Sequence, residues 1–370
     1  MNDTTPGPHL FVDISAHGLG HLAQTAPVLN ALRHRLPCLR LTIRSALPKH
    51  RLQARLAGQF THIEGASDFG YVMRDATDID LAASAQAYRT AHTDWPARVA
   101  DEAAWLHALA PDLVLSNVAY LPLAGATRAG IPSLAMCSLN WADLFAHFFA
   151  GQPWAPSIQA EIDAAYAGAS FLRLTPAMPM PRLARVCDLP PVALPAQPRR
   201  NELRTALGCP ETSRIVLIAF GGIPKELPLT DWPPIPGVCW LNGNPASHGA
   251  TGTPALSDLP FSFSDVLASV DTVLTKPGYG TFVEAACAGT PVLYLRRPDW
   301  PEQDALIAWL HANARALEVS ARDLHRGELA EALLTLWQQP APLPPTADGV
   351  ADVAERLSLY LIKHTTCLNR

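Results

Sequence analysis

Three glycine-containing loops carry the residues of this chain whose types and spacing could do chemistry. The most informative runs from Lys276 to Glu284 and reads KPGYGTFVE. Gly278 and Gly280 lack a Cβ and let the backbone approach a ligand closely. We expect a helix to start here, with Thr281 as its cap and Glu284 three residues on, in the spacing of a capping box. Free N–H groups at a helix start bind phosphate, so the segment predicts a phosphate-ester site with a carboxylate that can accept hydrogen bonds from sugar hydroxyls.

A second loop, residues 15–21 (SAHGLGH), holds His17 and His21 around Gly18 and Gly20. It follows a predicted strand and precedes a predicted helix, which is the context of a phosphate or substrate loop. Histidine is the side chain whose ordinary pKa suits base chemistry near neutral pH. The simpler interpretation is that His21 only caps the helix and His17 only packs. Because the loop lies at the carboxyl end of a parallel strand, we expect at least one of them to face a ligand.

The third loop, residues 220–225 (FGGIPK), also follows a strand and can offer the N–H groups of Gly221 and Gly222 to a phosphate. Lys225 would add a charge, although a single surface lysine is more often only solvated. Lys276 is open to the same two interpretations, a phosphate contact or a strand-end charge.

Another polar segment, residues 296–304 (RRPDWPEQD), leaves a predicted strand and enters a predicted helix. Acidic residues are common at helix starts for dipole reasons alone. Glu302 and Gln303 also face the expected crevice, where an acid and an amide could hold sugar hydroxyls.

These loops need parallel strands to position them, and the hydrophobic pattern supplies such strands. Residues 22–36 form a predicted helix, with an apolar face at Leu22, Ala26, Leu29, Leu32 and Leu36. Short apolar runs alternate with longer amphipathic ones, which indicates parallel sheets covered on both faces. The predicted strands are residues 9–15, 39–44, 113–116, 133–137, 214–220, 238–241, 270–275 and 291–295.

The alternation occurs twice, so we expect two domains. We place an N-terminal Rossmann-like domain at 1–180 and a second at 201–345. Residues 181–200 are rich in proline, which disfavours interior helices and central strands, and are the predicted linker. Residues 346–370 form a predicted terminal helix that packs back toward the N-terminal domain.

Bulk composition excludes several classes of protein. The chain has 370 residues, of which 49% are hydrophobic and 16% charged, so it can bury large cores. A formal net charge of −5 gives no support for nucleic-acid binding. Its 7 cysteines are scattered without a C-x-x-C pair, which indicates neither a zinc site nor a disulfide framework. No signal peptide and no apolar run of membrane-spanning length is visible, so we expect a cytoplasmic protein.

Together these features resemble the GT-B glycosyltransferase group. The loop at 18–21 (GLGH) is similar to the Q-G-H loop of UDP-glycosyltransferases and the G-G-H loop of the bacterial cell-wall N-acetylglucosaminyltransferase. The closest resemblance is to the glycosyltransferase-like N-terminal domain of plant L-arabinokinase. It is carried by HGLGH at 17–21, PDLVLSN at 111–117, KPGYGT at 276–281 with Glu284, and VLYLRRPDWPE at 292–302.

The resemblance implies an α/β GT-B fold, in which two Rossmann-like domains present parallel sheets to a central cleft. The N-terminal domain would bind an acceptor and the C-terminal domain a nucleotide-diphosphate sugar, a UDP-sugar first and a dTDP- or GDP-sugar in reserve. Glu284 would hold the ribose, backbone groups the diphosphate, and Glu302 with Gln303 the sugar. The donor-binding set is Gly221, Gly222, Lys276, Gly278, Tyr279, Gly280, Thr281, Glu284, Glu302 and Gln303.

For the reaction, the resemblance implies an inverting transfer without bound metal or cofactor, with His21 as general base and His17 as its rival. UDP-glycosyltransferases have an aspartate supporting the base where this chain has Asn117. Either another acid such as Asp13 takes that role, or the base is organised differently. The expected acceptor-side residues are Gly18, Gly20, Asn117 and Trp141.

The acceptor and the oligomeric state are left open by the sequence. The aromatic residues at 141–149 (WADLFAHFF) could line a sugar-stacking surface or an interfacial patch for a lipid-linked acceptor, but such spacing is more often core, and a membrane patch lacks supporting charge. Two other functions remain: a nucleotide-sugar hydrolase on the same scaffold, and a non-catalytic nucleotide-sugar-binding module.

Overall fold

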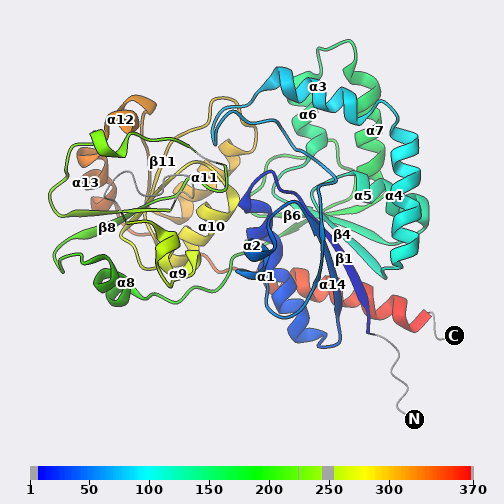
Figure 1. Ribbon diagram of the computed structural model, residues 1–370, viewed down its shortest axis with the longest axis horizontal. Helices are drawn as coiled ribbons and strands as arrows, with labels where there is room; N and C mark the ends of the chain where they lie inside the picture. Colours follow the sequence, from blue (N-terminus) through cyan, green and yellow to red (C-terminus); the bar gives the residue numbers. More distant parts are fainter. Residues whose placement is uncertain (1–6, 224, 244–253, 368–370) are drawn as a thin grey trace.

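The computed structural model describes residues 7–223, 225–243 and 254–367, which form two α/β lobes side by side (Figure 1). Within these residues, the N-terminal domain contains one sheet of 7 parallel strands, in the order β3-β2-β1-β4-β5-β6-β7. The two central strands are buried along their whole length, as an apolar strand covered on both faces must be. The strands are β1 (His9–Ile14), β2 (Arg40–Ser45), β3 (Thr61–Glu64), β4 (Leu113–Asn117), β5 (Ser133–Cys137), β6 (Ser170–Leu174) and β7 (Val186–Leu189).

Helices cover both faces of this sheet. Alternate residues of β1 point to opposite sides: Leu10 and Val12 pack with α1, while Phe11 packs in a second cluster with Leu106 and Ala126 of α4 and α5. Figure 1 shows α1 on one side and α3 to α7 gathered on the other. The helices are α1 (Leu19–Arg35), α2 (Lys49–Gln53), α3 (Leu81–Ala91), α4 (Trp95–Leu109), α5 (Leu121–Ala129), α6 (Trp141–Phe149) and α7 (Ala155–Ala167).

The C-terminal domain repeats the arrangement with a sheet of 5 parallel strands among the described residues, in the order β12-β11-β10-β8-β9. Its strands are β8 (Arg214–Ile218), β9 (Val238–Asn242), β10 (Thr272–Thr275), β11 (Val292–Tyr294) and β12 (Ala316–Glu318). Its helices are α8 (Arg200–Leu207), α9 (Phe263–Leu267), α10 (Tyr279–Ala288), α11 (Gln303–Asn313), α12 (Ala321–Arg326) and α13 (Ala330–Gln338), with short 3₁₀ turns η1 (Leu229–Asp231) and η2 (Leu256–Asp258). The predicted α/β class with two Rossmann-like domains is confirmed.

The chain crosses between the domains twice. Strand β7 lies inside the range 181–200 predicted as linker, because the residues VCDL between the prolines pair with β6 at the sheet edge. Residues 190–199 then make the first crossing. The second crossing returns the chain to the N-terminal domain before Gly349. There helix α14 (Gly349–Cys367) packs against α1 and β7 and buries Val353, Ala354 and Leu357.

An aromatic core fills the N-terminal domain behind α6. Trp141, Phe145 and Phe149 are all buried there, so the aromatic run at 141–149 forms core and not a surface patch. Trp300, from the C-terminal domain, packs into the same cluster and so forms an apolar contact between the two lobes. Among the described residues, no helix combines the length and apolar composition that a bilayer crossing needs.

Candidate active site between the two domains

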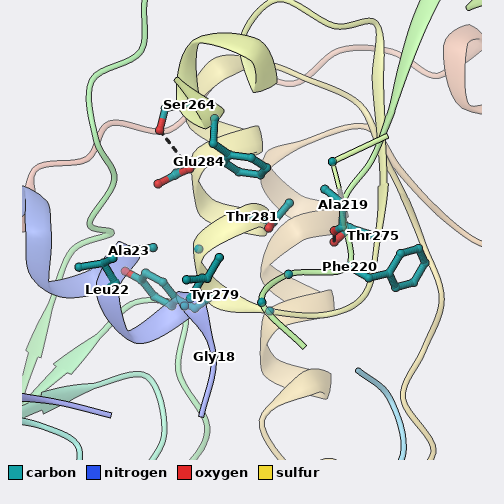
Figure 2. A pocket seen from close by; sticks show the side chains of 18 of the residues that line it. Gly18, Leu22, Ala23, Ala219, Phe220, Ser264, Thr275, Tyr279, Thr281 and Glu284 are labelled. Carbon is teal, nitrogen blue, oxygen red and sulfur yellow. Dashed lines mark hydrogen bonds between the residues drawn. The ribbon is translucent and has the colours of Figure 1, made fainter. Parts of the chain in front are cut away.

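A cleft of about 760 Å³ lies between the domains, and Figure 2 shows α1 facing α10 across it. It forms where the strand order reverses, between β1 and β4 on one side and β8 and β10 on the other, which is where parallel α/β sheets bind ligands. All three predicted loops contribute to its wall. The predicted residues that line it are His17, Gly18, Gly20, His21, Gly221, Gly222, Lys276, Gly278, Tyr279, Gly280, Thr281, Glu284 and Glu302.

The start of α10 presents free backbone N–H groups to this cleft. The helix begins at Tyr279, and its first internal hydrogen bond is from Phe282 N to Gly278 O at 3.1 Å. The N–H groups of residues 279–281 therefore have no acceptor within the helix. The capping-box prediction was wrong: Gly278 is the N-cap, no side chain caps the helix, and Thr281 lies inside the first turn. The anion-binding helix start does not need that cap.

Gly280 serves domain packing more directly than ligand approach. A Cβ added there would lie 2.7 Å from the Ala23 Cβ of α1, a distance real Cβ atoms do not tolerate. A Cβ at Gly278 would meet nothing closer than the Lys276 Nζ at 3.8 Å. The glycine at 280 thus lets α1 and α10 pack directly against each other in the wall of the cleft.

Glu284 lies one turn into α10 with its carboxylate on the cleft wall and 5% of the residue exposed. Arg55 of the N-terminal domain donates to both of its oxygens, at 2.6 and 3.3 Å. Ser264 Oγ adds a bond of 3.4 Å (Figure 2). A ribose at Glu284 would have to share or replace the Arg55 guanidinium.

Two cationic side chains, the half-buried Lys276 and the buried Arg297, face the same space. Burial, with the neighbouring Arg297 as second cause, lowers the pKa of Lys276 to about 7. Burial likewise lowers the pKa of Arg297 to about 10. The Arg297 guanidinium lies 3.9 Å from the Trp300 ring centroid, and its Nε has no hydrogen-bond partner among the described residues. Positive charge held this way, with Glu302 as the nearby acid, favours an anionic ligand.

His21 is 6% exposed and its Nδ1 lies 2.6 Å from the Asn117 Oδ1. Burial lowers its pKa to about 4, against a smaller raising effect of the Asn117 bond. Its imidazole is therefore neutral at pH 7 and can accept a proton.

His17 stacks on Trp300, with ring centroids 5.7 Å apart and planes at 9°. Burial first, and then the charges of His21, Arg297 and Lys276, hold its pKa well below the ordinary value. Its Nε2 has no partner within the described part of the chain. Both histidines of the predicted loop thus face the cleft as neutral bases.

Asp13 does not reach His21. Its carboxylate accepts from Arg44 Nε at 2.6 Å and from Ser67 Oγ at 2.7 Å, on the far side of β1. Among the described residues, the only polar side chain that bonds the His21 imidazole at normal hydrogen-bond length is that of Asn117, which is fully buried. The prediction that Asp13 stands in for the missing aspartate is wrong in this structure.

Three further residues that were predicted to line the site instead bind other groups of the protein. Gln303 exchanges two bonds of 2.9 Å with the backbone of Arg297 and shapes the loop behind the cleft. Lys225 binds Asp75 at 2.9 Å across the domain boundary. Trp141 is buried and donates from Nε1 to Asp68 at 2.7 Å, where it supports His17 from behind.

Among the cleft residues that the sequence interpretation missed are Gln24, Arg55, Ser138, Arg297 and Trp300. Ser138 directly follows β5, and the rule that placed His17 after β1 could have found it. Arg297 and Trp300 lie in the quoted segment 296–304 but had no assigned role. Arg55 follows a short helix in the N-terminal domain, and no local spacing links it to Glu284.

The fold is the GT-B fold of glycosyltransferases. Solved structures with this fold include the glycosyltransferase of kitacinnamycin, with TM-score 0.60, 15% identity and 97% and 96% of the two chains covered. Medicago truncatula UGT71G1, complexed with UDP-glucose, gives TM-score 0.57 and 13% identity over 100% and 99%. VinC, in complex with dTDP, gives 0.54 and 18% over 95% of each chain. These likenesses confirm the predicted fold.

Among curated proteins, L-arabinokinase of Arabidopsis thaliana is 27% identical over 365 residues, 95% of this chain. The chain spans about a third of that relative's length, since the match covers 34% of it. No family model matches the chain. The predicted resemblance to this plant protein is confirmed at the level of sequence.

Proposed function

We propose that this chain is a glycosyltransferase that moves a sugar from a nucleotide-diphosphate donor, with a UDP-sugar favoured, to an acceptor hydroxyl. One observation carries the proposal: the open N-terminus of α10, the cationic side chains of Lys276 and Arg297, and a neutral histidine all face one interdomain cleft. Two structural neighbours, one complexed with UDP-glucose and one with dTDP, support a nucleotide-sugar donor.

The donor would lie along the C-terminal wall. The N–H groups of residues 279–281 and the loop at Gly221–Gly222 would hold the diphosphate, since a helix start combines free donors with a favourable dipole. Lys276 and Arg297 add positive charge where negative charge grows as the diphosphate leaves. On this basis we propose that transfer needs no bound metal. Glu284 would accept from the ribose hydroxyls.

The acceptor would approach from the N-terminal wall. His21 Nε2 removes the acceptor's hydroxyl proton while the acceptor oxygen attacks the anomeric carbon. The bond from that carbon to the phosphate oxygen breaks, and its electron pair leaves with the diphosphate. A single displacement of this kind inverts the anomeric centre. A positioned base contributes roughly 10²–10⁴-fold to such a step.

The test is a thermal-shift screen of UDP-, dTDP- and GDP-sugars, followed by assays of nucleoside diphosphate release with and without an acceptor panel. A ligand that binds only the folded state at 100 times its Kd stabilises it by about 2.7 kcal/mol. Transfer predicts acceptor-dependent release that is lost in His21→Ala. No stabilisation by any donor at millimolar concentration would contradict the proposal.

Two other outcomes identify the alternative functions. Release of free sugar without acceptor, still dependent on the histidines, would identify a nucleotide-sugar hydrolase in which water takes the acceptor's place. Donor binding with equal turnover by wild type and the His17→Ala/His21→Ala double variant would identify a binding module.

A further inference from the structure

A continuous chain of buried hydrogen bonds connects the proposed base to the opposite domain. His21 Nδ1 lies 2.6 Å from Asn117 Oδ1, and Asn117 Nδ2 donates to Gln24 Oε1 at 2.9 Å. Gln24 Nε2 donates to Ser138 Oγ at 2.7 Å, and Ser138 Oγ donates to Glu302 Oε1 at 2.6 Å. All five residues are at most 6% exposed. No other set of described polar side chains links the two domains through so many buried steps.

The chemistry of these groups fixes the direction of the whole chain. An ionised carboxylate only accepts, so the Ser138 hydroxyl must donate to Glu302. The Ser138 oxygen then accepts from the Gln24 amide nitrogen, which turns the Gln24 carbonyl toward the amide nitrogen of Asn117. The oxygen of Asn117 therefore faces His21 and can only accept from it. His21 must carry its proton on Nδ1, which leaves the lone pair on Nε2.

We infer that Glu302 is a positioning residue for the base: it sets the His21 tautomer through Ser138, Gln24 and Asn117, and takes the place of the aspartate that Asn117 replaces. This rests on the proposed function of His21. Glu302 belongs to the C-terminal domain and the other four members to the N-terminal domain. The base is therefore set for proton removal only while the domains are closed as in this structure.

We call the hydrogen-bond chain from His21 to Glu302 the relay. The other groups that contact the two ends of the relay bind more weakly than its own members. Cys137 Sγ lies 3.8 Å from His21 Nδ1, and burial raises the pKa of this thiol to about 12, so it stays a weak neutral group. At the other end, Trp300 Nε1 donates to Glu302 Oε2 at 3.1 Å, which leaves Oε1 for Ser138. The Trp300 bond keeps the carboxylate oriented without interrupting the relay.

The experiment reads the tautomer directly, by ¹⁵N NMR of the imidazole nitrogens at pH 7, with His21→Gln used to assign the signals. Wild type should show a proton on Nδ1 and a bare Nε2. Ser138→Ala should give a mixed population, and the isosteric Glu302→Gln, which can donate to Ser138 and reverse the chain, should favour the proton on Nε2. Ser269→Ala removes a comparably buried serine outside the relay and is the control for general loosening.

A rescue experiment distinguishes a role of Ser138 in setting the His21 tautomer from a role in packing alone. A carboxylate at position 117 accepts from Nδ1–H without help from the relay, so Asn117→Asp added to Ser138→Ala should restore the wild-type tautomer. In the transfer assay, Ser138→Ala should lower kcat by at least about tenfold, and the double variant should recover most of it. A merely structural role of Ser138 would not be repaired in this way.

Two results would overturn the inference: a wild-type tautomer in Ser138→Ala and Glu302→Gln, or no rescue of the tautomer by Asn117→Asp. If no donor supports transfer, the proposed function fails, but the NMR readout still decides whether Glu302 orients His21.

Discussion

Lys276 and Arg297 place positive charge on the wall of the interdomain cleft. Burial is the main cause that lowers the pKa of each group, and for Lys276 the charge of Arg297 lowers the pKa further. The backbone N–H groups of α10 point into the same space. At the scale of single residues, this wall of the site therefore favours an anion.

Proton uptake should accompany diphosphate binding. At pH 8, Lys276 with its pKa of about 7 is mostly neutral, and a bound anion raises that pKa and charges the amine. We expect uptake approaching one proton per UDP at pH 8 and much less at pH 6. Titration calorimetry in buffers of different ionisation enthalpy measures this directly.

Lys276→Met should abolish the uptake at pH 8. Lys225→Met is the matched control, because the Lys225 amine is bound to Asp75 and lies outside the cleft lining. A binding enthalpy independent of the buffer in wild type would show that Lys276 does not change its charge.

His21 should make the fold sensitive to mild acid. In the unfolded chain it takes up a proton near its ordinary pKa of 6.5, but in the folded protein only near 4. Between these values the unfolded state binds more protons, so stability falls as pH drops. From pH 7 to pH 5, His21 should account for a loss of about 2 kcal/mol in the free energy of unfolding.

Urea unfolding at the two pH values tests this. Between pH 7 and pH 5, the free energy of unfolding should fall less in His21→Gln than in wild type, by about the amount assigned to His21. His34→Gln changes an exposed position on the same helix and should behave as wild type. Equal losses in all three proteins would refute a low folded-state pKa for His21.

At the scale of elements, the contact of α1 with α10 brings the acceptor-side loop and the phosphate-binding helix start together. Gly280→Ala would place a methyl group 2.7 Å from the Ala23 Cβ. Because these helices belong to different domains, we expect the lobes to separate rather than either core to deform. Small-angle X-ray scattering should show a larger radius of gyration and calorimetry a weaker affinity for UDP.

Ala23→Gly offers a compensating change, since it removes the atom that Gly280→Ala would strike. The double variant should recover the compact radius of gyration, even though glycine within α1 costs about 1 kcal/mol of helix stability. If the double variant stays as open as Gly280→Ala alone, the contact does not control closure.

Most of the strands that position the site could be predicted from the sequence, because they are encoded locally. The run 9–14 is apolar and precedes a glycine loop, and the apolar spacing from Leu22 to Leu32 fits a helix, so strand, loop and helix were all placed. The predicted cap of α10 lies three residues too late, because Thr281 is a plausible cap by residue type and Gly278 takes that position instead. Boundaries depend on such small differences between neighbouring residues.

The polar partners in the cleft could not be predicted in the same way. Glu284 finds Arg55, which is 229 positions away, and Glu302 finds Ser138 across 164. Both pairs form only when two separately folded domains meet, so no spacing within either segment encodes them. The loops at the strand ends show where ligands bind, whereas the pairing that tunes each side chain depends on how the domains dock.

At the scale of the whole molecule, ion pairs hold the lobes together over the cleft. Arg55 and Glu284 form the more buried of these, with 17% and 3% of their side chains exposed. Lys225 and Asp75 form another at 16% and 36%. The first lies within the cleft lining and the second outside it.

Arg55→Met should lower the stability of the ligand-free protein and increase the rise in Tm that UDP produces. Removing one partner of a buried pair leaves the Glu284 carboxylate uncompensated, at a cost of roughly 3 kcal/mol. A bound ribose then restores hydrogen bonds to it, so UDP should raise the Tm of Arg55→Met more than that of wild type. Differential scanning fluorimetry with and without saturating UDP measures both changes.

Lys225→Met breaks the other interdomain pair and should lower the Tm without enlarging the UDP response. If Arg55→Met gains no more from UDP than wild type does, Glu284 is not the ribose acceptor.

The two crossings of the chain touch one another, since Gly349 N donates to Pro191 O at 3.0 Å and a Cβ on Gly349 would collide with Pro190 O. The C-terminal lobe is in effect an insertion tethered at both of its ends, with α14 completing the core of the other lobe. Such a double attachment suppresses twisting and sliding and leaves one main swing axis through the paired crossings. Opening of this protein should then follow a single coordinate, so that one interdomain distance is enough to describe its whole range of motion.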